Sequence, residues 1–146
     1  MKTQLKTILL LLFVSVMMQS STVLPKEDYH SHRILSFYKK YYDVMSNPTS
    51  KDTNMRLYNL LKTYCTSEFA NCQMNETTNG AGVDFIAMDF IDSLNPETIE
   101  VSKIEENIYR VSFIAKRQNI DGSNSLEKIS LLVTLQGLYI SDVNKE

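Results

Sequence analysis

The spacing of apolar residues changes partway along the chain. Between residues 27 and 74 apolar residues recur at every third or fourth position, whereas between residues 98 and 143 they mostly alternate with polar residues. The first spacing places side chains on one face of a helix, and the second places them on one face of a strand. Helices followed by an antiparallel meander are typical of an α+β fold, in which the helices pack on one sheet.

Two amphipathic helices and a shorter third one are predicted. The first covers about residues 27 to 45 and ends at Asn47-Pro48, because the residue before a proline disfavours helical geometry. Its apolar residues are Ile34, Leu35, Tyr38, Tyr41, Tyr42 and Met45. The second begins near Thr53, and its expected apolar face is Leu57, Tyr58, Leu60, Leu61 and Tyr64. The third covers residues 66 to 74, and a loop is expected from Asn75 to Gly82.

Four strands are predicted in the second half of the chain. The first begins near Thr98, and the other three cover residues 108–116, 126–135 and 138–143. Polar turns separate them at Glu106-Asn107, at residues 120–124 and at Gln136-Gly137, and the Asp-Gly pair in the middle turn is typical of a hairpin. One face of the second strand is apolar: Tyr109, Val111, Phe113 and Ala115.

The N-terminal residues have the pattern of a signal peptide. Lys2 and Lys6 precede an apolar run from Ile8 to Met18. As a helix this run spans roughly 16 Å, about half the thickness of a bilayer core, which suits a signal peptide better than a membrane span. The alternative is a buried N-terminal helix. We expect a signal peptide over residues 1–21 and a single domain over residues 22–146.

Export to a periplasm or to the outside of the cell is therefore expected. No cysteine follows the apolar run closely, so a lipoprotein anchor is not predicted. No second long apolar run follows either, so we expect no stable membrane anchor.

Composition excludes several classes of function. The chain is 43% hydrophobic and 22% charged, as in an ordinary globular protein, and its formal net charge is −2. A weakly acidic chain without a basic block is a poor match for nucleic acid. Nucleotide-binding loops, nucleophile elbows and zinc-protease motifs are absent from the sequence, so neither a cofactor nor a metal is predicted.

Cys65 and Cys72 are a candidate disulfide if the chain is exported, because disulfides persist in oxidising compartments. On one continuous helix they would lie about 10.5 Å apart, beyond the roughly 7 Å limit between bridged Cα atoms. A bond therefore requires a break in the helix, which Thr66 or Ser67 provides if it acts as an N-cap. The sequence leaves both the bonded and the free state open.

Four short motifs, taken in their order, resemble a known family. They are Phe37-Tyr38-x-x-Tyr41, Tyr64-x-Thr66-x-x-Phe69, Asp84-Phe85-x-x-x-x-Asp89 and the segment from Gly137 to Val143. Together they are similar to small exported bacterial proteins of unknown function with an NTF2-like, or cystatin-like, fold. The resemblance covers about residues 30 to 143. It implies a curved antiparallel sheet wrapped around helices as a cone with one open end, and it implies no activity.

A cone of this kind favours a binding function, and we predict no catalytic residue. One hypothesis is a small amphipathic ligand held between the tyrosine-bearing helices and the sheet. The candidate pocket residues are Tyr38, Tyr41, Tyr58, Tyr64, Asp89, Tyr109 and Phe113. The alternative for the same aromatic residues is a packed core in which the hydroxyl groups reach solvent or backbone.

The second hypothesis is an envelope or secreted protein partner, with a homodimer also possible. Its contact surface is the outer face of the sheet, with Ile108 and Ile114, or the loop from Asn75 to Gly82. It requires a contiguous exposed apolar patch of several hundred Å², which is lost if Ile108, Ile114 and their neighbours are buried under helices.

An isomerase or hydrolase that uses Asp and Tyr is the alternative function. It requires a carboxylate with a raised pKa inside the cone. Asp84, Asp89 and Asp92 are the conspicuous acidic residues, although aspartates in such segments usually cap turns. His30 and His32 are two apart on a helix, cannot ligate one metal together, and are expected at the surface.

Overall fold

The computed structural model describes residues 28–46, 52–78, 93–119 and 121–146. The predicted signal peptide, Asp84, Asp89 and Asp92 lie outside these residues. The helices are α2 (Tyr29–Ser46), α3 (Thr53–Tyr64) and α4 (Ser67–Thr78). After β1 (Ser93–Leu94) and a 3-10 turn (Pro96–Thr98) come β2 (Glu100–Glu105), β3 (Ile108–Gln118), β4 (Asn124–Gln136) and β5 (Tyr139–Lys145). The chain thus has the predicted α+β fold, with helices before strands.

Side-chain caps mark where two of the helices begin. Asp28 precedes α2, and its carboxylate accepts hydrogen bonds from the His30 amide and the Ser31 hydroxyl. The Thr66 hydroxyl accepts a hydrogen bond from the Phe69 amide over 3.3 Å, so the predicted helix break lies between α3 and α4. α4 continues to Thr78, and the expectation that a loop begins at Asn75 is therefore wrong.

The buried stripe of α2 is rotated from the predicted one. Phe37 and Val44 are buried, whereas Leu35 and Tyr42 are only partly buried and Met45 is exposed. Leu35, Tyr42 and Met45 form a second row at the same spacing, and the periodicity alone does not say which of two adjoining rows faces the sheet.

The sheet is antiparallel throughout, with the order β1-β3-β4-β5. β2 also pairs with β3, on the edge that β1 uses. Between these two short strands, the Thr98 hydroxyl accepts a hydrogen bond from the Ile114 amide over 2.9 Å and so continues the hydrogen bonding of that edge. β1 and the 3-10 turn were not predicted, because a two-residue strand has no periodicity to detect.

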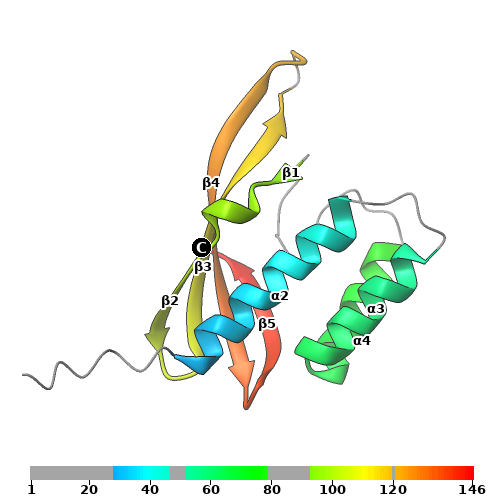
Figure 1. Cartoon of the computed structure of the whole chain (residues 1–146), viewed down its shortest axis with the longest axis vertical. Coiled ribbons are helices and arrows are strands. Elements are labelled where there is room, and N and C mark those ends of the chain that lie inside the picture. The colour runs from blue at the N-terminus through cyan, green and yellow to red at the C-terminus, as the bar shows by residue number, and fades with distance from the viewer. Residues whose placement is uncertain (1–27, 47–51, 79–92, 120) are drawn as a thin grey trace, which may run out of the picture.

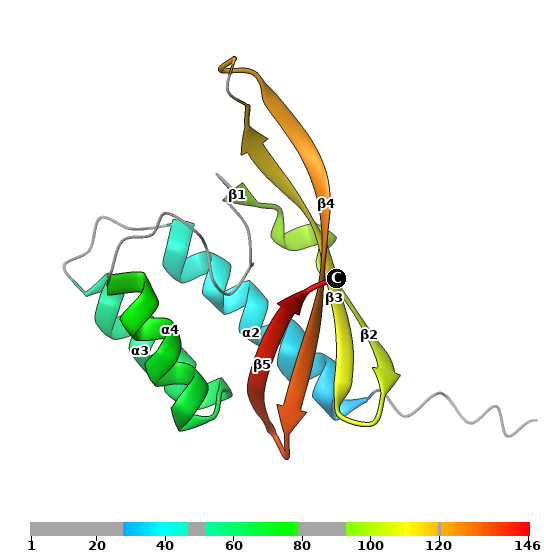
Figure 2. The ribbon, with the colours of Figure 1, turned by 180° about the vertical axis from the view of Figure 1, so that it is seen from behind.

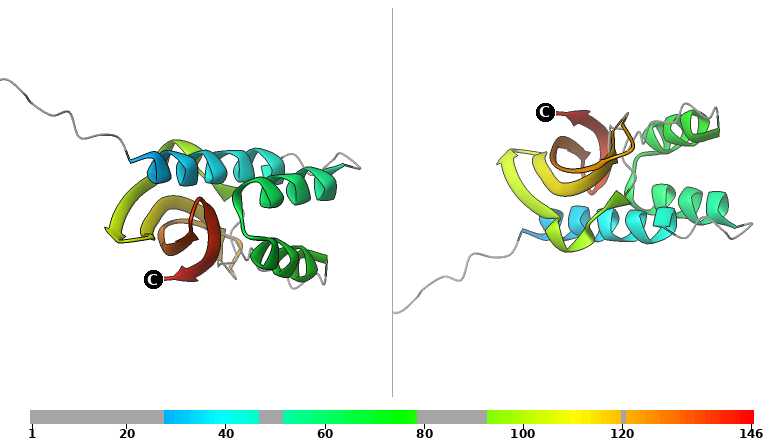
Figure 3. Two further views of the ribbon diagram at one scale, coloured as in Figure 1. Left: turned by 90° about the horizontal axis from the view of Figure 1, so that it is seen from below. Right: turned by 90° about the horizontal axis from the view of Figure 1, so that it is seen from above.

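The helices cover one face of a curved sheet, as the end-on views show (Figure 3). α2 crosses this face, while α3 and α4 lie beside it (Figure 1). The outer part of the β3–β4 hairpin extends beyond the helices, which is also clear from behind (Figure 2). None of the helices in the described part of the chain is long and apolar enough to cross a membrane.

The core lies between α2 and the sheet. The predicted apolar face of β3 is confirmed, since all four of its side chains are buried. Opposite them on the same side of the sheet are Ile129, Leu131 and Val133 from β4.

Candidate functional site

Most of the candidate pocket residues come together in this core. Tyr38, Tyr41, Tyr64, Tyr109 and Phe113 are all buried and belong to one apolar cluster. Tyr58 does not join them, because it lies on the outer side of α3. There it is 37% exposed, and the Lys62 ammonium lies 5.0 Å from its ring centroid. Asp89 lies outside the described residues.

The buried rings are one another's neighbours. The ring centroid of Phe37 lies 5.2 Å from that of Tyr38, 6.1 Å from that of Tyr41 and 5.7 Å from that of Tyr64. Tyr38 in turn lies 6.3 Å from Phe113 on β3. These separations are those of stabilising aromatic pairs in protein cores.

At one end of the core, the Tyr109 hydroxyl donates a hydrogen bond to the carboxylate of Asp28. Burial and this hydrogen bond raise the pKa of Tyr109 to about 12. For Asp28, burial favours the neutral form, but the hydrogen bonds from Tyr109, His30 and Ser31 outweigh it and lower the pKa. At neutral pH the pair is therefore a phenol and a carboxylate.

His30 lies beside this pair and is only partly exposed, which corrects the expectation of a surface position. Its ring centroid lies 6.1 Å from that of Tyr109, and its Nδ1 is buried without a hydrogen-bond partner in the described structure. The isomerase alternative requires a carboxylate with a raised pKa, whereas the shift in the pKa of Asp28 has the opposite direction.

A second polar cluster surrounds the hydroxyl of Tyr64, where α2 meets α3. The Lys40 ammonium donates to this oxygen over 2.9 Å, and the Ser36 hydroxyl lies 3.0 Å from it. Burial favours the neutral phenol, but these contacts and the positive charges of Lys40 and Arg33 outweigh it and lower the pKa of Tyr64. The cluster therefore favours the phenolate of Tyr64 more than water does.

Arg33 ties three elements together next to this cluster. Its Nε donates to the carbonyl of Leu138, in the β4–β5 turn, over 2.8 Å. Its Nη2 donates to the carbonyl of Thr63, near the end of α3, over 2.6 Å. The guanidinium carbon also lies 4.7 Å from the ring centroid of Tyr64. Since both carbonyls belong to the chain itself, the contacts of Arg33 hold α2, α3 and the β4–β5 turn together.

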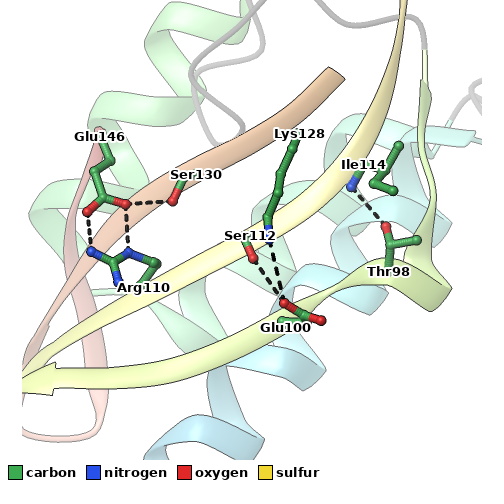
Figure 4. A network of polar contacts seen from close by, with 8 residues as sticks. All are labelled: Thr98, Glu100, Arg110, Ser112, Ile114, Lys128, Ser130 and Glu146. Atoms are coloured by element: carbon green, nitrogen blue, oxygen red, sulfur yellow. Dashed lines mark hydrogen bonds and ion pairs between the residues drawn. The ribbon is translucent and has the colours of Figure 1, made fainter. Parts of the chain in front are cut away.

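The opposite face of the sheet carries two charged clusters (Figure 4). In the first, the Glu146 carboxylate accepts hydrogen bonds from both Arg110 Nε, over 2.7 Å, and Arg110 Nη2. It also accepts one from the Ser130 hydroxyl over 2.6 Å. These bonds lower the pKa of Glu146 to about 2.

The second cluster joins three strands. The Ser112 hydroxyl on β3 donates to the Glu100 carboxylate on β2 over 3.4 Å, and the Lys128 ammonium on β4 lies 3.9 Å from the same oxygen. Apolar side chains lie next to both clusters. Ile114 is 38% exposed, Leu126 is 77% exposed, and Ile108 is partly exposed. Ile108 and Ile114 on this face are therefore not buried under a described helix.

The candidate disulfide is not formed, since Cys65 and Cys72 are both free. The helix break that the bond requires is present, but Cys72 lies on the exposed side of α4 whereas Cys65 is buried. Burial raises the pKa of the Cys65 thiol to about 12, which makes it a poor nucleophile. Within the described ranges, no group of three or more His, Cys, Asp or Glu side chains could hold a metal ion.

Sequence reasoning did not single out Asp28, Arg33 or Glu146. Asp28 had a detectable signal, as an aspartate at the start of a predicted helix, but that signal indicates a cap and not a contact with Tyr109. The pairing of Arg110 with Glu146 depends on β3 and β5 both flanking β4 in one particular register. The alternation in β3 does place Arg110 and Ser112 on the face opposite Tyr109 and Val111, as Figure 4 shows.

Comparisons with known proteins concern the fold. No protein-family model matches the sequence, and no curated protein matches it. A protein of unknown function from Bacteroides thetaiotaomicron has a similar structure, with a TM-score of 0.59 and 18% identity over 90% of this chain and 98% of its own. A de novo designed β-sheet protein has a TM-score of 0.51 and 15% identity, over 80% of this chain and 87% of its own. At these identities the chain shares a fold with both proteins, and the likeness extends no further.

Proposed function

We propose that the chain is an exported, NTF2-like binding domain without a catalytic role. Its ligand is an envelope or secreted protein, bound through the face of the sheet turned away from α2. The observation that carries this proposal is the exposure of Ile114 and Leu126, which lie on the same face of the sheet as the two charged clusters.

This combination suits recognition of a protein. Exposed apolar side chains supply the area that a partner buries, and neighbouring charges select the partner and its orientation. Arg110 and Glu146 already pair in the free chain. Since these two side chains are held together before binding, less conformational entropy is lost when the partner arrives.

Two further observations support the rest of the proposal. The signal-peptide pattern of residues 1–21 supports export. The order of elements, with helices before a curved antiparallel meander, supports an NTF2-like fold. The alternative, a small amphipathic ligand held in the cone, is supported less well. The buried rings of Tyr38, Tyr109 and Phe113 pack against other core side chains, which occupy the space that such a ligand would need.

The test compares two substitutions that place a lysine at an exposed apolar position. Ile114→Lys changes the proposed surface, and Met55→Lys changes α3, where Met55 is also exposed. Each purified protein is immobilised and used to capture proteins from the envelope and secreted fractions of the producing organism. We expect the Met55→Lys protein to retain the partner of the unchanged chain and the Ile114→Lys protein to lose it.

Thermal unfolding of both variants checks that neither substitution unfolds the domain. Equal capture by the two variants contradicts the proposed surface. Native mass spectrometry of the purified chain addresses the ligand alternative, since a bound small molecule that dissociates on unfolding contradicts a purely protein-binding role.

A further inference from the structure

Two positively charged side chains of α2 lie against the same aromatic ring of α3. The Arg33 guanidinium carbon lies 4.7 Å from the ring centroid of Tyr64, and the Lys40 ammonium lies 5.3 Å from it. Ser36 lies between them on the same stripe of α2, and its hydroxyl is 3.0 Å from that of Tyr64. Two cations and two hydroxyl groups therefore gather where α2 meets α3.

Neither of these cations pairs with a carboxylate of the described residues. The other three arginines of the chain each pair with one: Arg56 with Asp43, Arg110 with Glu146 and Arg117 with Glu127. Arg33 donates instead to two backbone carbonyls, and Lys40 donates to the Tyr64 hydroxyl. Asp43 lies one turn beyond Lys40 on α2, and Arg56 holds it over 3.1 Å. The junction of α2 and α3 thus carries positive charge that the described side chains do not balance.

Three hydrogen-bond donors of this cluster have no acceptor among the described residues. An ammonium carries three N–H groups, and the Tyr64 oxygen accepts from one of those of Lys40 over 2.9 Å. The contact between Ser36 and Tyr64 uses one of their two hydroxyl protons, and either residue can supply it. Two N–H groups of Lys40 and one hydroxyl proton remain. Lys40 is exposed and Ser36 is partly exposed, so an anion from solvent can reach these donors.

The cluster lies against an apolar floor. Tyr64 is buried, and its ring centroid lies 5.7 Å from that of Phe37, which is also buried. Leu61, one turn earlier on α3, is buried as well. Charge interactions are stronger beside such a floor than in bulk water, because the local dielectric constant is lower.

We propose that Lys40, Ser36 and Tyr64 bind a tetrahedral oxyanion of the phosphate class. The Lys40 ammonium and one of the two hydroxyl groups donate to its oxygens, and Tyr64 is a phenol when the anion is bound. Arg33 adds positive charge from the other side of the Tyr64 ring.

The geometry of the donors favours a tetrahedral anion over a carboxylate. A carboxylate is bound best by the parallel N–H groups of a guanidinium. Arg33 already directs Nε to the Leu138 carbonyl and Nη2 to the Thr63 carbonyl. The donors that remain are an ammonium and a hydroxyl, and such separate point donors suit a group whose oxygens point in different directions.

The site lies between two helices, on the opposite side of the sheet from the surface proposed for the protein partner. It therefore does not rest on the proposed function, and either can fail alone. Partner capture that separates Ile114→Lys from Met55→Lys, in a chain that binds no phosphate, overturns the oxyanion site and leaves the proposed function standing.

Isothermal titration calorimetry of the purified chain with inorganic phosphate tests the site, at about 0.15 M salt so that distant charges are screened. Lys40→Met is expected to weaken phosphate binding about tenfold or more, as the loss of a charge-assisted hydrogen bond does. Lys39→Met is the matched control, because it removes the same charge from the adjacent exposed position of α2. It is expected to change the affinity less than about twofold. Equal weakening in both variants, or no binding to the unchanged chain, overturns the proposal.

A second titration series distinguishes the kinds of anion. Inorganic phosphate and glycerol phosphate present the same tetrahedral group, one as the free ion and one as a monoester. Binding of both assigns the site to phosphate monoesters as well, and binding of inorganic phosphate alone assigns it to the free ion; either result supports the proposal. Acetate that binds as tightly as phosphate overturns the choice of a tetrahedral anion.

The absorbance of the Tyr64 phenolate locates the bound anion without a substitution in the site. A neighbouring dianion disfavours the phenolate, so phosphate is expected to raise the pKa of Tyr64 relative to chloride at equal ionic strength. A Tyr64→Phe protein identifies the signal. A cluster that only holds α2 and α3 together gives the same pKa in both salts, and that result overturns the placement of the anion at Tyr64.

Discussion

Tyr64 and Tyr109 are both buried phenols, yet their surroundings shift their pKa values in opposite directions. Tyr109 donates to a carboxylate, which favours the protonated phenol and raises its pKa. Tyr64 accepts from an ammonium and has two cations near its ring, which favours the phenolate and lowers its pKa. The sign of the neighbouring charge distinguishes two residues that are alike in burial.

Replacing Lys40 with Met is expected to raise the pKa of Tyr64, because the phenolate loses its ammonium donor. Phenolate absorbance during an alkaline titration measures this shift, with a Tyr64→Phe protein to identify the signal. The folded-state pKa of Tyr64 lies below the unfolded value of about 10. The contact with Lys40 therefore adds to the free energy of unfolding. This contribution is complete at a pH above the unfolded-state pKa of Tyr64, and it is lost as the pH falls through the folded-state pKa. Lys39→Met is the neighbouring control, and identical curves for the two lysine variants contradict the assignment.

At the scale of elements, the turn between β4 and β5 depends on the backbone conformation of one glycine. Gly137 lies between β4 and β5 with φ +63°, a left-handed conformation that disfavours most side chains. A Cβ built at this position meets no heavy atom within 4 Å, so backbone conformation alone sets the cost of a substitution.

Gly137→Ala is expected to lower the free energy of unfolding by about 1 kcal/mol. Gly137→Asn is expected to lower it less, because asparagine adopts the left-handed region more readily. Urea unfolding of the two variants measures both changes. Equal stability of the alanine and asparagine variants contradicts a conformational origin.

Elements with many residues at one periodicity were the predictable part of the fold. The buried face of β3 follows from its alternation, because only one of its two faces is apolar at every position. Tyr58 was misplaced in α3 because an aromatic ring with a nearby lysine is also stable at the surface.

The candidate site was predictable only in part. The alternation identifies which residues share the outer face of the sheet, but the contacts of Arg110 with Glu146 and of Tyr109 with Asp28 join distant parts of the chain. Such contacts depend on strand order and on how α2 lies across the sheet, and no local pattern encodes either.

At the scale of the whole molecule, an aromatic layer between α2 and the sheet is a central part of the single buried core. Phe113 is 1% exposed and lies against Tyr38. Phe113→Ala is expected to cost roughly 3–5 kcal/mol, a large part of the total for a domain of this size. Phe113→Leu is expected to cost less, because it leaves a smaller void. Denaturant midpoints measure both, and an alanine variant as stable as the leucine variant contradicts a packed layer.

The position of β3 within the sheet has a consequence for how the protein is made. This strand pairs with β1, β2 and β4, and it carries the side chains that cover α2. During synthesis the helices leave the ribosome first, and the apolar face of α2 then has no sheet to pack on. The β3–β4 hairpin, whose contacts are local, can form as soon as both of its strands are available. The core closes only after the second half of the chain has been made, so until then α2 exposes its apolar face, the kind of surface on which nascent chains aggregate.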